Sequence, residues 1–208
     1  MNKKFELVMD QKIEVFGITL FRIKALVSFA DVEVGEIGGY VEKEENLQVY
    51  GNAWVYGNAQ VYGDAQVSGD AQVYGNARVY GNARVYGNAW VSGNARVYGN
   101  ARVYGNARVY GNAWVYGNAR VYGDAHYLTI GPIGSRDDTI TFFRTKELKI
   151  AVKIGCFKGT IDEFILKVNK THAENDHAKA YLLAAEIAKV RIDLSPEENK
   201  NTSHDPEE

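Results

Sequence analysis

The sequence contains a single cysteine, Cys156, and no long uninterrupted apolar segment. One cysteine excludes an internal disulfide framework and is typical of a protein from a reducing compartment. A helix that crosses a bilayer needs roughly 18 consecutive apolar residues, and a signal peptide needs a shorter apolar run. The chain has neither, although Lys3 and Lys4 stand near its start. We therefore expect a cytoplasmic protein with no membrane partner.

Lysine and glutamate are absent from segment 49–125, although the whole chain has 24 basic and 26 acidic residues. The formal net charge of −2 excludes a uniformly basic protein, so we expect no general nucleic-acid binding. Within the segment, six arginines outnumber three aspartates, and the remaining acid lies in the flanks. The polar and acidic composition of residues 195–208 predicts a disordered tail.

Segment 49–125 consists of a six-residue unit, Val-Tyr-Gly-Asn-Ala-Arg with small variations, repeated thirteen times without a gap. Repetition at a fixed short period predicts a solenoid, because one unit cannot bury an apolar face alone. The invariant, β-branched valine predicts a short strand with valine inside and its two neighbours outside. Gly-Asn or Gly-Asp predicts a turn, and the following alanine fits an inward position. Three units would close one triangular coil of eighteen residues.

The unit resembles the hexapeptide repeat of left-handed parallel β-helices, in which an aliphatic and a small residue recur at this spacing. This resemblance implies a mainly β fold with just over four triangular coils. A second resemblance extends to about residue 194 and includes E-V-F-G-I-T-L-F-R-I-K-A-L, G-G-Y-V-E-K-E-E-N-L and G-P-I-G-S-R-D-D. With the array, these segments are similar to bacteriophage and prophage proteins described as hexapeptide transferase-like or polymer-forming. This similarity implies a phage or prophage origin without an established activity.

The flanks of the array predict caps, because a β-helix with bare ends exposes unpaired strand edges. Short strand-like runs before the array predict an N-terminal β-meander, with turns at Asp10-Gln11 and at Gly17. After the array, a glycine-rich loop, two strands and two helices predict a small ββαα domain. Thr160 and Glu163 form a capping box for the first helix, and the second runs from about residue 175 to 191. The expected domains are the N-terminal β cap 1–48, the left-handed β-helix 49–126, the C-terminal α+β domain 127–194 and the tail 195–208.

Residues eighteen positions apart stack in such a coil, so the variable outward position forms three columns. These columns are Trp54, Gln72, Trp90, Arg108 and His126; Gln60, Arg78, Arg96 and Trp114; and Gln66, Arg84, Arg102 and Arg120. The residue after valine adds columns that are mostly tyrosine. Exposed tyrosine and tryptophan beside arginine are typical of surfaces that contact proteins or nucleotides. The candidate ligand- or partner-binding residues are Arg78, Arg84, Arg96, Arg102, Arg120, Tyr80, Tyr98, Tyr116, Trp90, Trp114 and Arg136.

A purely structural origin of these columns stays open, since arginine can stack on a neighbouring tyrosine and tandem duplication copies residues without selection. Arg136 belongs to the loop 131–138, which we interpret as a tight connection although glycines and arginine can also cradle a phosphate.

The sequence offers few catalytic candidates. The resemblance to hexapeptide-repeat proteins includes acyltransferases, which use a histidine base. The first histidine in the array is His126, at its last edge, and we expect it to be solvated or structural. Cys156 precedes a helix, and we expect it to be buried and structural. His172 and His177 lack metal-ligand spacing. We therefore assign no catalytic residue, metal or cofactor.

The sequence thus favours a non-enzymatic interaction or scaffold protein. It would self-associate through flat solenoid faces as a dimer or trimer. It would bind a host protein or an anionic, nucleotide-like partner through its arginine, tyrosine and tryptophan columns or its C-terminal domain. With a phage origin, inhibition of host defence is the corresponding role. The alternatives are an acyltransferase-like enzyme with a pocket of His126 or His172 and Cys156, and a passive structural or virion component.

Overall fold

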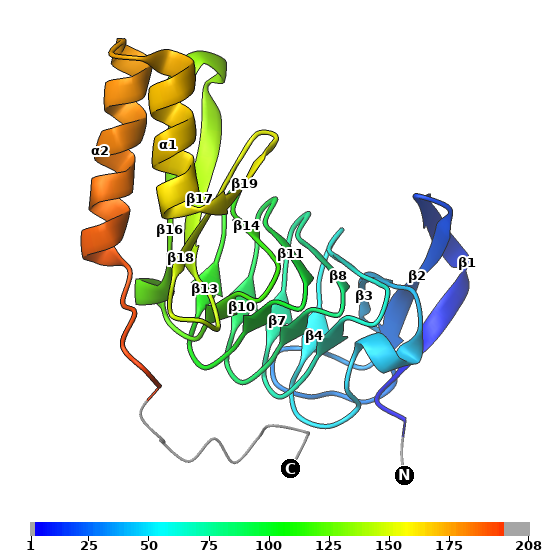
Figure 1. The fold of residues 1–208 in the computed structure, drawn as a ribbon. Helices are drawn as coiled ribbons and strands as arrows, with labels where there is room; N and C mark the ends of the chain where they lie inside the picture. The colour runs from blue at the N-terminus through cyan, green and yellow to red at the C-terminus, as the bar shows by residue number, and fades with distance from the viewer. Residues whose placement is uncertain (1–2, 198–208) are drawn as a thin grey trace.

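The structure is a computed structural model that describes residues 3–197, and its central body is the predicted β-solenoid (Figure 1). Three parallel sheets run along the coil and define three faces. The first face consists of β3 (Ile37–Val41), β5 (Gln60–Val61), β8 (Arg78–Gly81), β11 (Arg96–Gly99) and β14 (Trp114–Val115). The second face consists of β4 (Trp54–Val55), β7 (Gln72–Val73), β10 (Trp90–Val91) and β13 (Arg108–Val109). The third face consists of β6 (Gln66–Val67), β9 (Arg84–Val85), β12 (Arg102–Val103) and β15 (Arg120–Val121).

The strand register confirms the stacking of residues eighteen positions apart. Arg96 pairs with Arg78 on one side and Trp114 on the other, and Arg102 pairs with Arg84 and Arg120. Each outward side chain therefore lies one strand spacing, about 4.8 Å, from its counterparts in the neighbouring turns.

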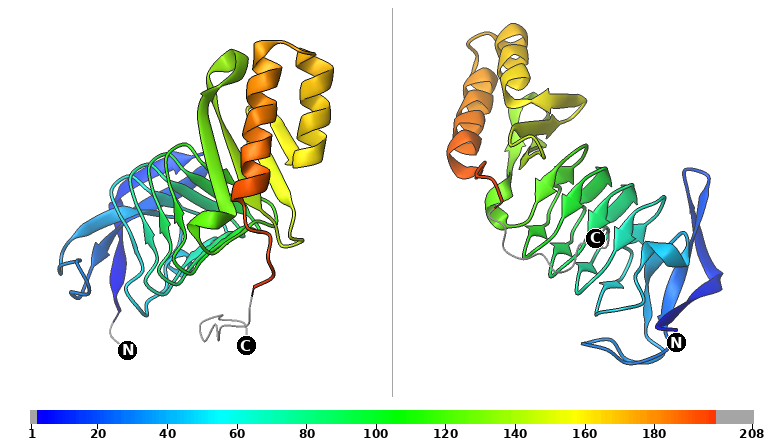
Figure 2. Two further views of the ribbon diagram at one scale, coloured as in Figure 1. Left: turned by 90° about the vertical axis from the view of Figure 1, so that its left-hand side faces the viewer. Right: turned by 60° about the horizontal axis from the view of Figure 1, so that its bottom comes forward.

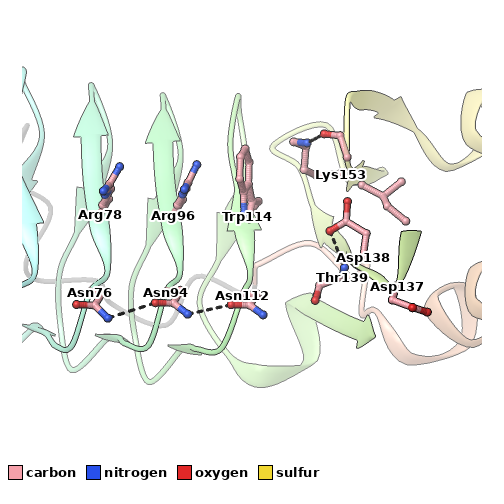
Figure 3. A pocket seen from close by; sticks show the side chains of 12 residues that line it. Asn76, Arg78, Asn94, Arg96, Asn112, Trp114, Asp137, Asp138, Thr139 and Lys153 are labelled. Atoms are coloured by element: carbon pink, nitrogen blue, oxygen red, sulfur yellow. Dashed lines mark hydrogen bonds between the residues drawn. The ribbon is translucent and has the colours of Figure 1, made fainter. Parts of the chain in front are cut away.

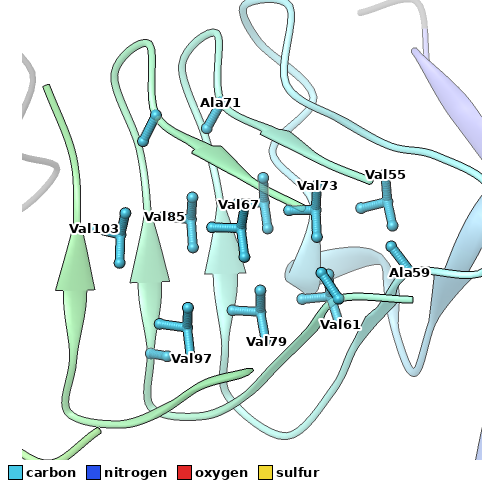
Figure 4. Close-up of a cluster of buried hydrophobic side chains, with 14 of the residues drawn as sticks. Val55, Ala59, Val61, Val67, Ala71, Val73, Val79, Val85, Val97 and Val103 are labelled. Atoms are coloured by element: carbon cyan, nitrogen blue, oxygen red, sulfur yellow. The ribbon is translucent and has the colours of Figure 1, made fainter. Parts of the chain in front are cut away.

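Valine and alanine fill the interior of the coil (Figure 4). From Ala53 to Val121 the repeat valines and alanines are 0% exposed, which confirms that both positions point inward. Val49, the first repeat valine, is the exception with 43% exposure, because no strand forms there. The coil nevertheless starts before the array, since Tyr40 in β3 pairs in parallel with Gln60 and Leu47 forms a bridge to Val67. The solenoid thus has about five turns, more than the repeats alone predict.

An N-terminal hairpin extends the first sheet beyond the coil. Its strands are β1 (Phe5–Val15) and β2 (Ile18–Ala25), and β2 pairs antiparallel with β3. The turn at Gly17 is confirmed, whereas the turn predicted at Asp10-Gln11 is wrong. Strand β1 continues through this position with a bulge between Val8 and Lys12, because both halves of β1 find partners in β2.

Trp54 corrects the expectation that every variable residue faces solvent. It is 0% exposed because Phe5 and Phe29 pack edge-on against its ring, with centroid distances of 6.3 and 5.4 Å. The N-terminal segment therefore covers the first tryptophan of the second face and leaves the later turns of that face uncovered.

The C-terminal domain has two strands more than predicted. Its antiparallel sheet is β16 (Tyr127–Ile133), β17 (Asp138–Arg144), β18 (Ile150–Ile154) and β19 (Phe157–Thr160), followed by α1 (Ile161–His172) and α2 (Asp176–Arg191). The predicted loop 131–138 is partly strand, because β16 forms a hairpin with β17 through the 3-10 turn Gly134–Arg136. The capping box of α1 is confirmed: Oε2 of Glu163 accepts from N–H of Thr160 at 2.8 Å, and Oγ1 of Thr160 accepts in return.

The domain packs on the last coil, at the end opposite the hairpin (Figure 2). The backbone N–H of Trp114 donates to Oγ1 of Thr141 at 3.1 Å, and the hydroxyl of Tyr116 donates to the carbonyl of Val152 at 3.3 Å. The strand β17 thereby covers the edge of the first and third faces. Neither helix found in residues 3–197 is long and apolar enough to traverse a bilayer. Residues 195–197 of the predicted tail are described and contact Arg144, and residues 198–208 lie outside the described part of the chain.

Candidate functional site

The candidate residues lie on separate surfaces. Arg78, Arg96, Trp114 and the tyrosines Tyr80, Tyr98 and Tyr116 lie on the first face, Trp90 on the second, Arg84, Arg102 and Arg120 on the third, and Arg136 in the C-terminal domain. Three of these surfaces are hollowed, and one hollow is a groove of about 580 Å³ between the first face and the C-terminal domain. We call it the junction groove; its lining includes Asn76, Arg78, Asn94, Arg96, Asn112, Trp114, Asp138, Thr139 and Lys153.

An asparagine ladder runs along the junction groove (Figure 3). Nδ2 of Asn76 donates to Oδ1 of Asn94 at 3.4 Å, and Nδ2 of Asn94 donates to Oδ1 of Asn112 at 3.1 Å. From the sequence these asparagines were predicted only as turn formers, and the ladder was not predicted. The signal was available, because the asparagines also recur every eighteen residues and so must stack.

A row of cationic and aromatic groups runs parallel to the ladder. Arg78 and Arg96 occupy adjacent turns, and Arg96 is followed by Trp114, whose ring centroid is 4.4 Å from Cζ of Arg96 (Figure 3). Nζ of Lys153, from β18, lies 4.4 Å from the same ring and donates to the carbonyl of Gly155. Burial, and then the nearby Lys158, lower the pKa of Lys153. The row therefore concentrates positive charge beside a rigid aromatic ring.

The acidic end of the groove lies in the C-terminal domain. Oδ1 of Asp138 accepts from the backbone N–H of Thr139 at 2.8 Å, and Asp137 adjoins it in the lining. The groove is thus bipolar: the solenoid wall carries arginines, and the domain wall carries the carboxylates together with Lys153. A ligand that matches it carries an anionic group at one end and hydrogen-bond donors at the other.

The tyrosines of the first face form a packed ladder. The rings of Tyr80 and Tyr98 stack at 4.9 Å, and those of Tyr98 and Tyr116 at 5.6 Å. Nζ of Lys158 lies 5.0 Å from the Tyr98 ring, so the domain covers part of the ladder. Burial raises the pKa of Tyr80 and Tyr116 to about 12, which keeps both hydroxyls neutral near pH 7. These tyrosines pack mainly against one another and are not among the residues that line the groove.

The second face carries exposed aromatic groups. Trp90 is 43% and Tyr110 is 58% exposed, and Cζ of Arg108 lies 5.1 Å from the Trp90 ring centroid. This surface has the composition of a contact surface between proteins.

The third face holds the basic cluster, which we define as Arg102, Arg120, Arg144 and Lys146. These cations line a pocket of about 250 Å³ together with Tyr86, Tyr104 and Glu197. Arg102 and Arg120 come from the predicted column, whereas Arg144 and Lys146 follow from the packing of the C-terminal domain on β15. Neither residue was predicted from the sequence, because nothing in the local sequence shows which coil the end of β17 contacts.

The third hollow, of about 340 Å³, lies within the C-terminal domain and contains Arg136, Cys156, His172 and Tyr181. Cys156 is exposed at the turn between β18 and β19, so the expectation of a buried cysteine is wrong. Burial was expected from the apolar residues before it, yet the tight β18–β19 hairpin leaves its tip in solvent. His172 contacts Tyr181 at 5.5 Å between ring centroids. The lining of this hollow therefore includes both the thiol of Cys156 and the imidazole of His172.

His126 departs from its predicted place in the outward column. It lies in a 3-10 turn, is 3% exposed, and packs with its ring centroid 3.8 Å from that of Tyr122. Burial lowers its pKa, followed by the charge of Arg144. The imidazole is therefore neutral near pH 7 and out of reach of a substrate on the coil. Within residues 3–197, no group of three or more His, Cys, Asp or Glu side chains is placed to hold a metal ion.

Comparison with known protein families matches the repeat array. The YdcK β-solenoid repeat matches the chain at residues 47–63, 59–75, 71–87, 77–93, 89–102, 101–117 and 113–126. No curated protein matches the sequence. The matched segments coincide with the coil from Leu47 to its last turn, where three parallel sheets surround a valine and alanine core. The chain is therefore a β-solenoid repeat protein whose array resembles that of YdcK.

Proposed function

We propose that this protein is a non-enzymatic binding protein that holds a nucleotide-like anion in the junction groove. The observation that supports this proposal is the row of Arg78 and Arg96, one turn apart, beside a ladder of asparagine amides. A guanidinium group presents a fork of N–H donors that suits phosphate, and a carboxamide can both donate to and accept from the edge of a base. The groove volume lies within the range of about 300–1,000 Å³ that is typical of small-ligand sites.

The bipolar lining supports this ligand class over a simple anion. A phosphate group would contact the arginines, while amino and hydroxyl groups of a base or ribose would donate to Asp138 and to the asparagine oxygens. Trp114 would keep Arg96 oriented, since the guanidinium lies over its ring. The groove therefore recognises phosphate and polar ring edges through different walls.

A biological role follows from the resemblance to phage and prophage proteins. In that setting the protein would act in the cytoplasm of a bacterial host. It would inhibit a host defence either by sequestering a nucleotide signal or by binding a host protein. The β-solenoid would serve as a rigid scaffold, since each turn is tied to the next by backbone hydrogen bonds and stacked side chains.

The groove proposal predicts which arginines matter. Titration calorimetry with a nucleoside diphosphate, a cyclic mononucleotide and a cyclic dinucleotide should detect binding of at least one of them. Arg96→Gln should weaken that binding at least tenfold, because one charge-assisted phosphate contact is lost, corresponding to about 1.4 kcal/mol or more.

Arg108→Gln provides the matched control. Arg108 occupies the same position of the repeat but lies on the second face, over Trp90. Its substitution should leave nucleotide affinity unchanged. Failure of all three nucleotides to bind, or equal losses from the Arg96 and Arg108 substitutions, would contradict the groove proposal.

Self-association as a dimer or trimer is the second part of the proposal, and the uncovered second face supports it. Trp90 and Tyr110 expose large aromatic surfaces there. Sedimentation equilibrium should show a closed oligomer that Trp90→Glu dissociates, because the substitution places a charge in an apolar contact.

A second exposed apolar stripe, Leu183, Ile187 and Val190 on α2, gives the competing surface. Dissociation by Leu183→Glu instead of Trp90→Glu would transfer the interface to α2, and unlimited filaments would favour a structural assembly role.

A further inference from the structure

The basic cluster on the third face is a built site that the junction groove does not include. Four cations line its pocket, and Glu197 is the one carboxylate among the described lining residues. Arg102 and Arg120 stack one turn apart, although like charges at this spacing repel. Burial, and then Arg102, lower the pKa of Arg120, which reflects the same repulsion. Nη1 of Arg120 donates to the carbonyls of Asn100 and Ala119, which holds its guanidinium at the pocket.

Arg144 closes the pocket from the C-terminal domain. Arg144 is only 1% exposed, and its guanidinium lies 5.0 Å from the Tyr122 ring centroid. Nε of Arg144 is buried and has no hydrogen-bond partner within residues 3–197. A buried cation with an unused donor is costly unless an anion accompanies it.

The last described residues of the chain supply that anion. After α2, the N–H of Asp193 donates to the carbonyl of Ala125 at 2.9 Å, which directs the chain toward the third face. Nη2 of Arg144 donates to the carbonyl of Ser195 at 2.8 Å, and Nη1 lies 3.5 Å from Oε1 of Glu197. The hydroxyl of Tyr104 donates to the same carboxylate oxygen. We call residues 193–197 the C-terminal strap.

We propose that the basic cluster is a second anion-binding site, suited to a small multiply charged anion such as pyrophosphate, and that the carboxylate of Glu197 occupies it as an internal competitor. The pocket volume of about 250 Å³ suits such an anion better than a whole nucleotide. Pyrophosphate presents more oxygens than one carboxylate, so it can engage Arg102 and Arg120 as well as Arg144 and Tyr104. Glu197 is 42% exposed in its side chain, so it can leave the pocket without unfolding a core element.

Calorimetric titration of the full chain with inorganic pyrophosphate tests this site. All proteins carry Arg96→Gln, which disables the junction groove and separates the two sites. Adding Glu197→Gln should tighten pyrophosphate binding at least fivefold, because the competing charge is removed while the side chain keeps its size. Adding Arg102→Gln to that variant should weaken binding at least tenfold.

Two control variants make the outcome decisive. Glu186→Gln removes one negative charge on α2, where Glu186 pairs with Lys189, and should leave pyrophosphate affinity unchanged. Arg108→Gln removes one positive charge from the second face and should also have no effect.

An affinity unaltered by Glu197→Gln would overturn the competitor role, and equal losses from the Arg102 and Arg108 substitutions would overturn the site. A thermal unfolding midpoint close to that of the Arg96→Gln protein confirms that each variant is folded. Neither result bears on nucleotide binding in the groove, which is measured with Arg96 intact.

Discussion

Val97→Asp is expected to unfold the middle of the solenoid. Val97 is 0% exposed and pairs in register with Val79 (Figure 4) and, on its other side, with Val115. An aspartate there would bury a charge among valine and alanine side chains, where no described group can pair with it. The cost should exceed about 4 kcal/mol, because an unpaired buried charge is among the most destabilising single changes. Each turn contacts only its neighbours, so the defect would also uncouple the turns on either side.

Urea unfolding followed by circular dichroism measures this effect. Val97→Ala should lose only about 2 kcal/mol, since it removes two methyl groups and leaves a small cavity. Ser92→Asp is the matched control, because Ser92 is an outward residue of the preceding unit, and it should change stability by less than about 0.5 kcal/mol. Equal losses for Val97→Asp and Ser92→Asp would show that the valine column is not the core of the coil.

Gly93→Ala is expected to be far more destabilising than Gly111→Ala, although both glycines have φ of +69° and occupy the same place in the unit. The left-handed conformation costs alanine about 1–2 kcal/mol at either site. At Gly93 the new Cβ would also lie 3.0 Å from the backbone N of Gly111, whereas at Gly111 nothing lies within 4 Å. The next turn cannot move away without breaking its strand pairing, so Gly93→Ala should lose about 1–2 kcal/mol more.

Thermal and urea unfolding of the two variants isolate the contribution of stacking, because the backbone strain is common to both. Gly117→Ala should behave like Gly111→Ala, since its Cβ also meets nothing within 4 Å. A loss at Gly111 as large as that at Gly93 would mean that φ alone imposes glycine at the corners of the coil.

Stacking also explains which parts of the binding surfaces were predictable. The eighteen-residue columns followed from the repeat, so the adjacency of Arg78 with Arg96 and of Arg102 with Arg120 was predicted correctly. The asparagine ladder follows from the same register and was overlooked. Arg144 and Glu197 belong to segments without a repeat, and their positions depend on how the C-terminal domain packs on β15.

Two of the wrongly predicted residues, Trp54 and His126, share one physical cause. Trp54 obeys the alternation of a strand but is covered by Phe5 of β1 and by Phe29, which follows β2; both precede the repeat array in the sequence. His126 lies where the coil ends, and the 3-10 turn that starts the C-terminal domain places it inside. Alternation states which side of a strand a residue occupies; it does not state what covers that side.

The sequence alone was sufficient for the solenoid, its inward valines and alanines, and its outward columns, because a short repeat imposes the same local structure in every unit and stacks each unit on its copies. Tertiary structure decided where those columns become sites. The C-terminal domain converts part of the first face into the junction groove through Asp138 and Lys153, and it closes the third face with Arg144. These contacts join segments without common periodicity, so they depend on the packing of one fold on another and not on local sequence pattern.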